Sequence, residues 1–279
     1  SVKGGHLSGD LLKPKQHEFL RDKAFTGFDN DADMIKIAVM NMYLHGLSQA
    51  NIRLFDPICT PNDDDRKYDV VLANPPFAGS VNKEAILEDI DLPTTATELL
   101  FVKYMIDHLV PGGRLGVIVP EGVLFSSTRA HKKLRQILLD ENTVEGIVSL
   151  PSGVFNPYSG VKTSILFVKQ GGKTDRVWFY EVTSDGFSLD DRRQPVKEND
   201  LPDLLKKWTD KRESERSWYA TRKDIEENDL NLTAARYKPH ELEAVEYPDP
   251  KEIVEEVLVL EEEIEKGLRS LLTKTYDGK

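Results

Sequence analysis

Residues 69–80 read DVVLANPPFAGS, and this stretch decides the fold. Residues 70–72 form a continuous apolar run, which is typical of a parallel strand covered on both faces. The two prolines that follow Asn74 end the strand, because proline has no N–H to donate to a neighbouring strand. Ligands of open α/β sheets bind beyond the carboxyl ends of the strands. The sequence therefore predicts that Asn74 and Phe77 are presented together at such a site.

The flanking sequence alternates between two periodicities. Apolar residues at helical spacing predict helices over 34–44, 98–109 and 129–139, the first begun by Asp31 or Asp33 and ended by Gly46. Pro111 and two glycines are expected to end the second helix. Short apolar runs predict strands over 51–59, 114–120, 144–151, 163–169 and 176–182. This order indicates a layered α/β sheet whose last, closely spaced strands form an antiparallel edge.

Composition limits the class of protein. The 279 residues have 39% hydrophobic content, which suits a globular protein, and no stretch reaches the roughly 20 apolar residues of a membrane span. We expect a cytoplasmic protein, since no leader is recognisable and the single cysteine, Cys59, suits a reducing compartment. The net charge of −11 argues against strong nucleic-acid binding by this chain alone and favours a subunit that receives nucleic acid from a partner. The six histidines lack metal-ligand spacing, so no metal is expected.

The chain divides into three predicted parts. Residues 1–183 are expected to form a catalytic domain, because charged residues dominate after Ser184 and the compact core is predicted to end there. Residues 184–244 would be a charged extension packed on that core. Residues 245–279 would be a helix, either lying on its own domain or docking on another subunit. Its apolar stripe comprises Ile253, Val257, Leu260, Ile264, Leu268 and Leu271.

The corner at residues 74–77 suits the methylation of an exocyclic amine. Such an amine on a purine ring is a poor nucleophile, because its lone pair is delocalised. The side-chain oxygen of Asn74 and the carbonyl of Pro75 can accept its two hydrogens, and Pro76 helps to hold these acceptors fixed. Phe77 offers a flat face to a base that has left the helix stack. The alternative is a proline-stiffened turn with a packed phenylalanine.

Two acids are candidates for binding the methyl donor. Asp29 follows a short apolar stretch and precedes a predicted helix, where an acid can bind ribose hydroxyls or simply complement the helix dipole. Asp56 ends another predicted strand and could contact the donor's adenine or the substrate amine. Asn74 would border the donor as well as the substrate.

Several segments in one order resemble the modification subunit of type I restriction–modification systems. They are GFDND, MNMYLHG, ANPPF, PGGRLGVIVPEGVLF and GIVSLPSGVFNPYSGVKTSILFVK, and the resemblance runs from about residue 20 to 240. It implies a Rossmann-like, S-adenosylmethionine-dependent methyltransferase sheet that methylates adenine N6 in DNA, with a specificity subunit and a nuclease subunit as partners. It also implies that residues 74–77 are catalytic, that Asp29 binds ribose and that Asp56 lies near the donor's adenine.

One part of the family pattern is not found. The family's glycine-rich donor loop, which resembles DPACGTGGF, has no counterpart here, and Gly4 and Gly5 are too short a substitute. The family's N-terminal helical domain is also missing. We therefore expect an incomplete sheet at the N-terminus and weak or no donor binding by this chain alone.

Two other functions stay open. The chain could be a non-catalytic scaffold that retains subunit docking. Asn-Pro-Pro followed by an aromatic residue also appears in methyltransferases that act on protein glutamine or on ribosomal RNA guanine. The extended match after residue 111 favours the type I subunit over the latter.

Overall fold

The computed structural model describes residues 11–61, 66–239 and 250–276 and divides the chain into two compact units, Ser1–Lys238 and Pro239–Lys279. The sequence predictions that concern Gly4 and Gly5 lie outside the described residues. No helix in the described ranges is long and apolar enough to cross a membrane.

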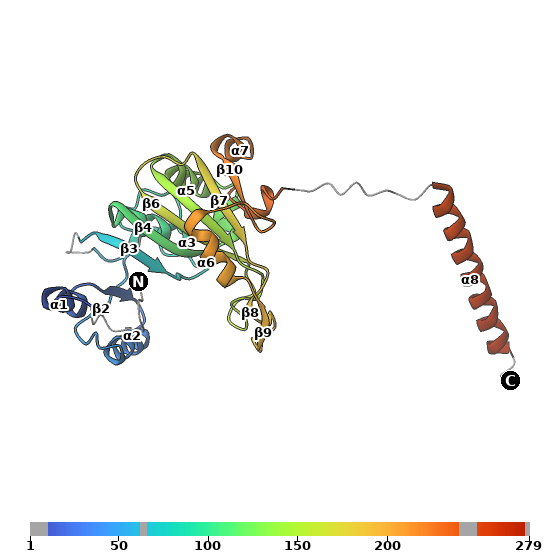
Figure 1. Cartoon of the computed structure of the whole chain (residues 1–279), viewed down its shortest axis with the longest axis horizontal. Coiled ribbons are helices and arrows are strands. Elements are labelled where there is room, and N and C mark those ends of the chain that lie inside the picture. The colour runs from blue at the N-terminus through green and yellow to red at the C-terminus, as the bar shows by residue number, and fades with distance from the viewer. Residues whose placement is uncertain (1–10, 62–65, 240–249, 277–279) are drawn as a thin grey trace. The chain divides into compact units, whose positions relative to one another are not determined.

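A six-stranded sheet forms the centre of the first unit (Figure 1). Its strand order is β10-β7-β5-β6-β4-β3. Strands β3, β4, β5 and β7 run in one direction, whereas β6 and β10 run in the opposite direction, so the sheet is mixed and β10 is an antiparallel edge strand. The bounds are β3 Tyr68–Ala73, β4 Leu109–Pro120, β5 Asn142–Ser149, β6 Thr163–Gln170, β7 Arg176–Glu181 and β10 Ser217–Thr221.

Helices cover both faces of this sheet. Alternation along β7 shows the two layers: Val177 and Phe179 join the larger buried cluster, whereas Trp178 and Tyr180 join the smaller one. The larger cluster includes residues of α3 (Thr97–Asp107), α4 (Glu121–Phe125), α5 (Arg129–Asp140) and α7 (Arg222–Glu227). The smaller cluster includes Leu204 of α6 (Leu201–Asp210). Short turns η1 (Lys83–Ala85) and η2 (Ala234–Arg236) and a hairpin, β8 (Asp185–Phe187) with β9 (Pro195–Asn199), complete this part.

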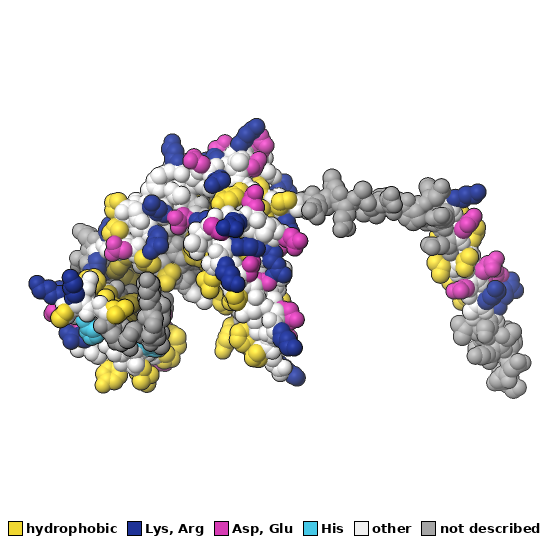
Figure 2. Space-filling view, viewed as in Figure 1, with side chains coloured by type: hydrophobic (Ala, Val, Ile, Leu, Met, Phe, Trp, Pro, Cys, Tyr) yellow, Lys and Arg dark blue, Asp and Glu magenta, His cyan; other side chains and the backbone are white. Residues whose placement is uncertain are grey.

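Residues 14–56 form a separate small lobe. It contains α1 (Pro14–Asp22), β1 (Thr26–Asp29), α2 (Ala32–Leu44) and β2 (Asn51–Leu54), and β1 pairs with β2 in parallel. The predicted cap of α2 is confirmed, since the Asp31 carboxylate accepts hydrogen bonds from the amides of Asp33 and Met34. No described residue from Leu11 to Pro57 is buried. Figure 2 shows apolar side chains on the surface of this lobe.

The prediction that residues 70–72 are covered on both faces is wrong. Strand β3 is the edge of the six-stranded sheet, and in the described chain only β4 pairs with it. Val70 is 50% exposed and Leu72 is 79% exposed. A groove of about 270 Å³ lies along this edge and is lined by residues of both β1 and β3. The continuous apolar run therefore belongs to a strand that is an exposed edge within the described part of the chain.

The core also extends further than composition indicated. Strand β10 pairs with β7, and Trp218 on β10 is fully buried although it lies well beyond Ser184. Leu232 and Ala234 are buried in the same cluster as residues of α3, α4 and α5. Charged residues dominate this region because its strands and helices each bury no more than three residues. Strand β4 likewise begins before Pro111, immediately after α3.

The second unit contains α8, Pro250–Tyr276. Five of its apolar residues, spaced along one helix, are between 55% and 62% exposed: Val257, Leu258, Leu260, Ile264 and Leu268. The side chains of Ile253 and Leu271, which belong to the predicted stripe, lie outside the described residues.

Candidate active site

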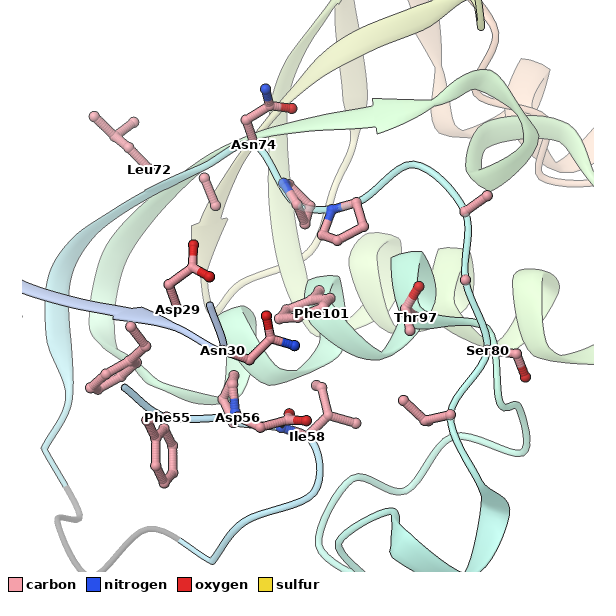
Figure 3. Close-up of a pocket in the computed structure, with 18 residues that line it drawn as sticks. Asp29, Asn30, Phe55, Asp56, Ile58, Leu72, Asn74, Ser80, Thr97 and Phe101 are labelled. Atoms are coloured by element: carbon pink, nitrogen blue, oxygen red, sulfur yellow. The ribbon is translucent and has the colours of Figure 1, made fainter. Parts of the chain in front are cut away.

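A pocket of about 550 Å³ lies beyond the carboxyl ends of β1, β2 and β3 (Figure 3). Asn74, Pro75 and Pro76 line it, together with the two predicted donor-binding acids, Asp29 and Asp56. Strands β1 and β2 form a two-stranded sheet of their own, and its carboxyl end contributes to the same pocket as that of β3. Figure 3 shows Asn74 at the top of the view, Asp56 lower down, and Asp29 between them.

Asp29 ends β1 and is exposed to the pocket. One of its carboxylate oxygens accepts a hydrogen bond from the Asp31 amide at 2.8 Å. Its backbone carbonyl accepts another from the amide of Phe55 at 2.9 Å, which ties the ends of β1 and β2 together. Asp31, and not Asp29, caps the following helix. Asp29 is therefore held by backbone contacts outside the helix, with its carboxylate available to a ligand.

Asp56 shapes the loop that follows β2. Its Oδ1 accepts hydrogen bonds from the amides of Ile58 at 2.9 Å and Cys59 at 3.3 Å. Burial, together with the neighbouring Asp56 carboxylate, raises the pKa of the Cys59 thiol, so this cysteine has little thiolate character. The acid thus has both a structural contact and a position on the pocket wall.

Sequence reasoning missed the apolar and hydroxyl side chains that complete the wall. Phe28 and Phe55 have ring centroids 5.2 Å apart, and both line the pocket beside the acids. Thr97 and Phe101 contribute from the start of α3. The Thr97 hydroxyl is inaccessible to solvent and makes no hydrogen bond within the described chain. Phe28 and Phe55 each directly precede a predicted donor-binding acid, and this position in the sequence could have identified them as pocket residues. Phe101 has the ordinary apolar spacing of a core helix, so the sequence does not distinguish it.

Phe77 has a different position from its three neighbours. It does not line the pocket, and its ring packs edge-on against Phe155, with centroids 5.0 Å apart and an interplanar angle of 68°. Phe155 belongs to the loop after β5, which leaves the sheet on the same side as the loop after β3 because these strands run in the same direction. The corner therefore carries two aromatic rings, as expected if the glycine- and proline-rich loop over 151–162 lies near the ligand-binding edge of the sheet.

The basic residues of α5 serve mainly the fold. Lys132 pairs with Asp229 and Lys133 pairs with Asp91. The guanidinium of Arg135 is fully buried and donates to the carbonyls of Val123 at 3.1 Å and Ser126 at 2.8 Å. These contacts favour a role in packing and surface pairing for the three residues.

A mixed open sheet with acids after two parallel strands and an Asn-Pro-Pro-Phe corner defines a Rossmann-like α/β protein with a ligand site at its strand ends. The chain belongs to the N-6 DNA methylase family, whose family model matches residues 9–245.

Known proteins agree with this assignment. The EcoEI methylase subunit of a type I restriction enzyme from Escherichia coli is 31% identical over 98% of this chain. The EcoKI methylase subunit from E. coli K12 is 31% identical over 63% of this chain. A crystal structure of the EcoKI M protein superimposes with a TM-score of 0.69 at 25% identity, covering 81% of this chain and 56% of that one. A structure of a type I restriction–modification system gives 0.72 at 28% identity, covering 96% and 57%.

These likenesses confirm the fold class and the family that the sequence predicted. The chain spans 58% of the length of the EcoEI subunit and 35% of the EcoKI subunit, about half or less of each relative.

Proposed function

We propose that this chain takes part in methyl transfer from S-adenosylmethionine to the N6 amino group of adenine in DNA, as the modification subunit of a type I restriction–modification complex. The observation that carries the proposal is the meeting of Asn74, Pro75 and Pro76 with Asp29 and Asp56 around one pocket. Family membership supplies the class of reaction.

The pocket wall fits the donor. Its two carboxylates are acceptors that suit ribose hydroxyls and an adenine amino group, and Phe28 and Phe55 offer apolar faces beside them. When bound, S-adenosylmethionine supplies an electrophilic methyl group on a sulfonium centre.

Asn74 and Pro75 act on the acceptor. The Asn74 amide oxygen and the Pro75 carbonyl accept the two hydrogens of the adenine amine, which makes the nitrogen more tetrahedral and frees its lone pair for the methyl group. Both acceptors are held in place by the two prolines, so little reorganisation is needed during the reaction. The amine becomes acidic only after a methyl group is added, so the site works without a strongly basic side chain. Phe77, supported by Phe155, provides a stacking face for the extruded base.

Helix α8 is proposed to dock on the specificity subunit. Its apolar residues are exposed within the second unit, and a stripe of this kind suits a seam with another helix. The net charge of −11 is in keeping with sequence reading by another subunit.

A labelled-donor assay tests the reaction. The chain, alone and mixed with its specificity subunit, is incubated with tritiated S-adenosylmethionine and unmethylated DNA, and the DNA is digested to nucleosides. Label in N6-methyl-2′-deoxyadenosine is expected, with a loss of about 10²–10³-fold in Asn74→Ala, comparable to the removal of one preorganised polar contact. Asn41→Ala, an exposed position on α2, is the matched control and keeps full activity.

Other outcomes identify the alternatives. Label in a release-factor protein or in ribosomal RNA, and not in DNA, would show that the methyl acceptor is protein glutamine or RNA guanine instead of adenine in DNA. Loss of label on every acceptor, with the specificity subunit still bound, would indicate a scaffold. Calorimetric titration with S-adenosylmethionine measures in parallel how much of the donor site this chain supplies.

A further inference from the structure

The hairpin of β8 and β9 extends from the six-stranded sheet and contributes almost nothing to the core (Figure 1). We refer to residues 183–200 as the arm. Most of its side chains are exposed, and Gly186 is its only buried residue. An element with so little buried surface needs a reason other than packing to hold a fixed position.

The arm is nevertheless strongly braced. At its base, one Asp200 oxygen accepts hydrogen bonds from the Thr183 amide and hydroxyl, both at 2.8 Å, and from the Ser184 amide at 3.0 Å. At its turn, Arg193 pairs with Asp185 and donates to the Ser188 carbonyl at 2.9 Å. These contacts give the arm a defined shape at both ends.

The turn of the arm touches the loop that carries Phe155. The side-chain amide of Asn156 donates to the carbonyl of Leu189 at 3.0 Å. Gly153, in the left-handed region with φ +91°, lies so close that an added Cβ would come within 2.5 Å of the same carbonyl oxygen. The Leu189 carbonyl is thus enclosed by Gly153 and Asn156, which flank Phe155 on either side.

Phe155 is in turn the contact of Phe77. The two rings meet edge to face at 5.0 Å, and the other side of Phe155 packs on the smaller core cluster. A chain of direct contacts therefore runs from the arm through Asn156 and Phe155 to the ring of Phe77.

We propose that the arm is a positioning element that fixes the Phe155 ring, and through it the Phe77 ring, as one aromatic platform for the extruded base. Asn156 and Arg193 are positioning residues: Asn156 joins the loop to the arm, and Arg193 keeps the turn of the arm in shape. The use of the platform for a base rests on the proposed function, whereas the mechanical link between the arm and Phe77 does not.

Fluorine NMR measures the link directly in the full chain. 4-Fluorophenylalanine is placed at position 77, where its signal depends on the neighbouring ring, and Phe155→Ala defines the signal of an unsupported ring. Asn156→Asp keeps the size of the side chain but removes the donor, and Arg193→Ala alters only the arm. Both are expected to move the signal at least halfway towards that of Phe155→Ala. Lys197→Ala, exposed on β9, is the control and leaves it unchanged.

An unshifted signal in both Asn156→Asp and Arg193→Ala, with Phe155→Ala shifted, would overturn the proposal. Tryptophan fluorescence confirms that each variant keeps the folded sheet, because Trp178 and Trp218 are buried there. Base binding is a separate readout, measured by quenching of 2-aminopurine in a single-stranded oligonucleotide. If Phe77→Ala leaves that quenching unchanged, Phe77 does not stack on the base, and this part of the proposed function is wrong. A shifted fluorine signal in the arm variants would still establish the contact between the arm and Phe77.

Discussion

Removing the buried guanidinium of Arg135 is expected to destabilise the chain strongly. Its side chain is fully buried in α5 and supplies two hydrogen bonds to the carbonyls of Val123 and Ser126. Arg135→Ala leaves both carbonyls without this donor, and each bond from a charged group contributes about 1.5–3 kcal/mol. Burial lowers the pKa of Arg135, which shows that desolvation opposes its charge and offsets part of this gain.

The expected net loss is about 3 kcal/mol, which corresponds to a fall in melting temperature of about 6–12 °C for a unit of this size. Thermal unfolding followed by tryptophan fluorescence measures it. Arg129→Ala removes the same charge from the exposed first residue of the same helix and is expected to change stability by less than about 0.5 kcal/mol. Equal melting temperatures for the two variants would refute the assignment of Arg135 to the fold.

Three further outcomes are expected. Burial raises the pKa of Tyr237 to about 12. The stability that its neutral hydroxyl provides is therefore complete below pH 10, and the free energy of unfolding falls by about 2 kcal/mol as the pH rises from 10 to 12. Denaturant titrations at each pH are expected to show that this part of the loss is absent in Tyr237→Phe. Leu72→Lys places a charge on the free edge of β3 and should reduce self-association in sedimentation experiments; unchanged association would mean that the edge is not the contact. Asp31→Ala removes the cap of α2 and should cost about 1 kcal/mol, seen as faster amide exchange confined to that helix.

The parts of the site that sequence reasoning found are those marked by unusual local chemistry. Asn74, Pro75 and Pro76 form a rare sequence after an apolar strand, and Asp29 and Asp56 are acids at strand ends, so each could be placed at one edge of a parallel sheet. These residues line one pocket, although β1 and β2 form a sheet separate from the one that contains β3.

The parts that were missed depend on tertiary neighbours. The pairing of Phe77 with Phe155 follows from the shared direction of β3 and β5, which local patterns do not reveal. The apolar run in β3 reads as a covered strand whether or not a second neighbour is present, so its exposure could not be predicted. Trp218 is buried because β10 pairs with β7, across a stretch whose composition is that of a surface.

The lack of buried residues in the small lobe has a consequence for how this protein unfolds. Opening a region costs less free energy when few apolar contacts are lost, so residues 14–56 form a unit that opens well before the six-stranded sheet. All three tryptophans, Trp178, Trp208 and Trp218, belong to the sheet or to a helix that covers it. Their fluorescence therefore does not change when the small lobe opens. Asp29, and with it one wall of the pocket, can therefore be lost while tryptophan fluorescence still reports a folded protein. A ligand that holds the lobe closed would show itself first in the amide exchange of β1 and β2.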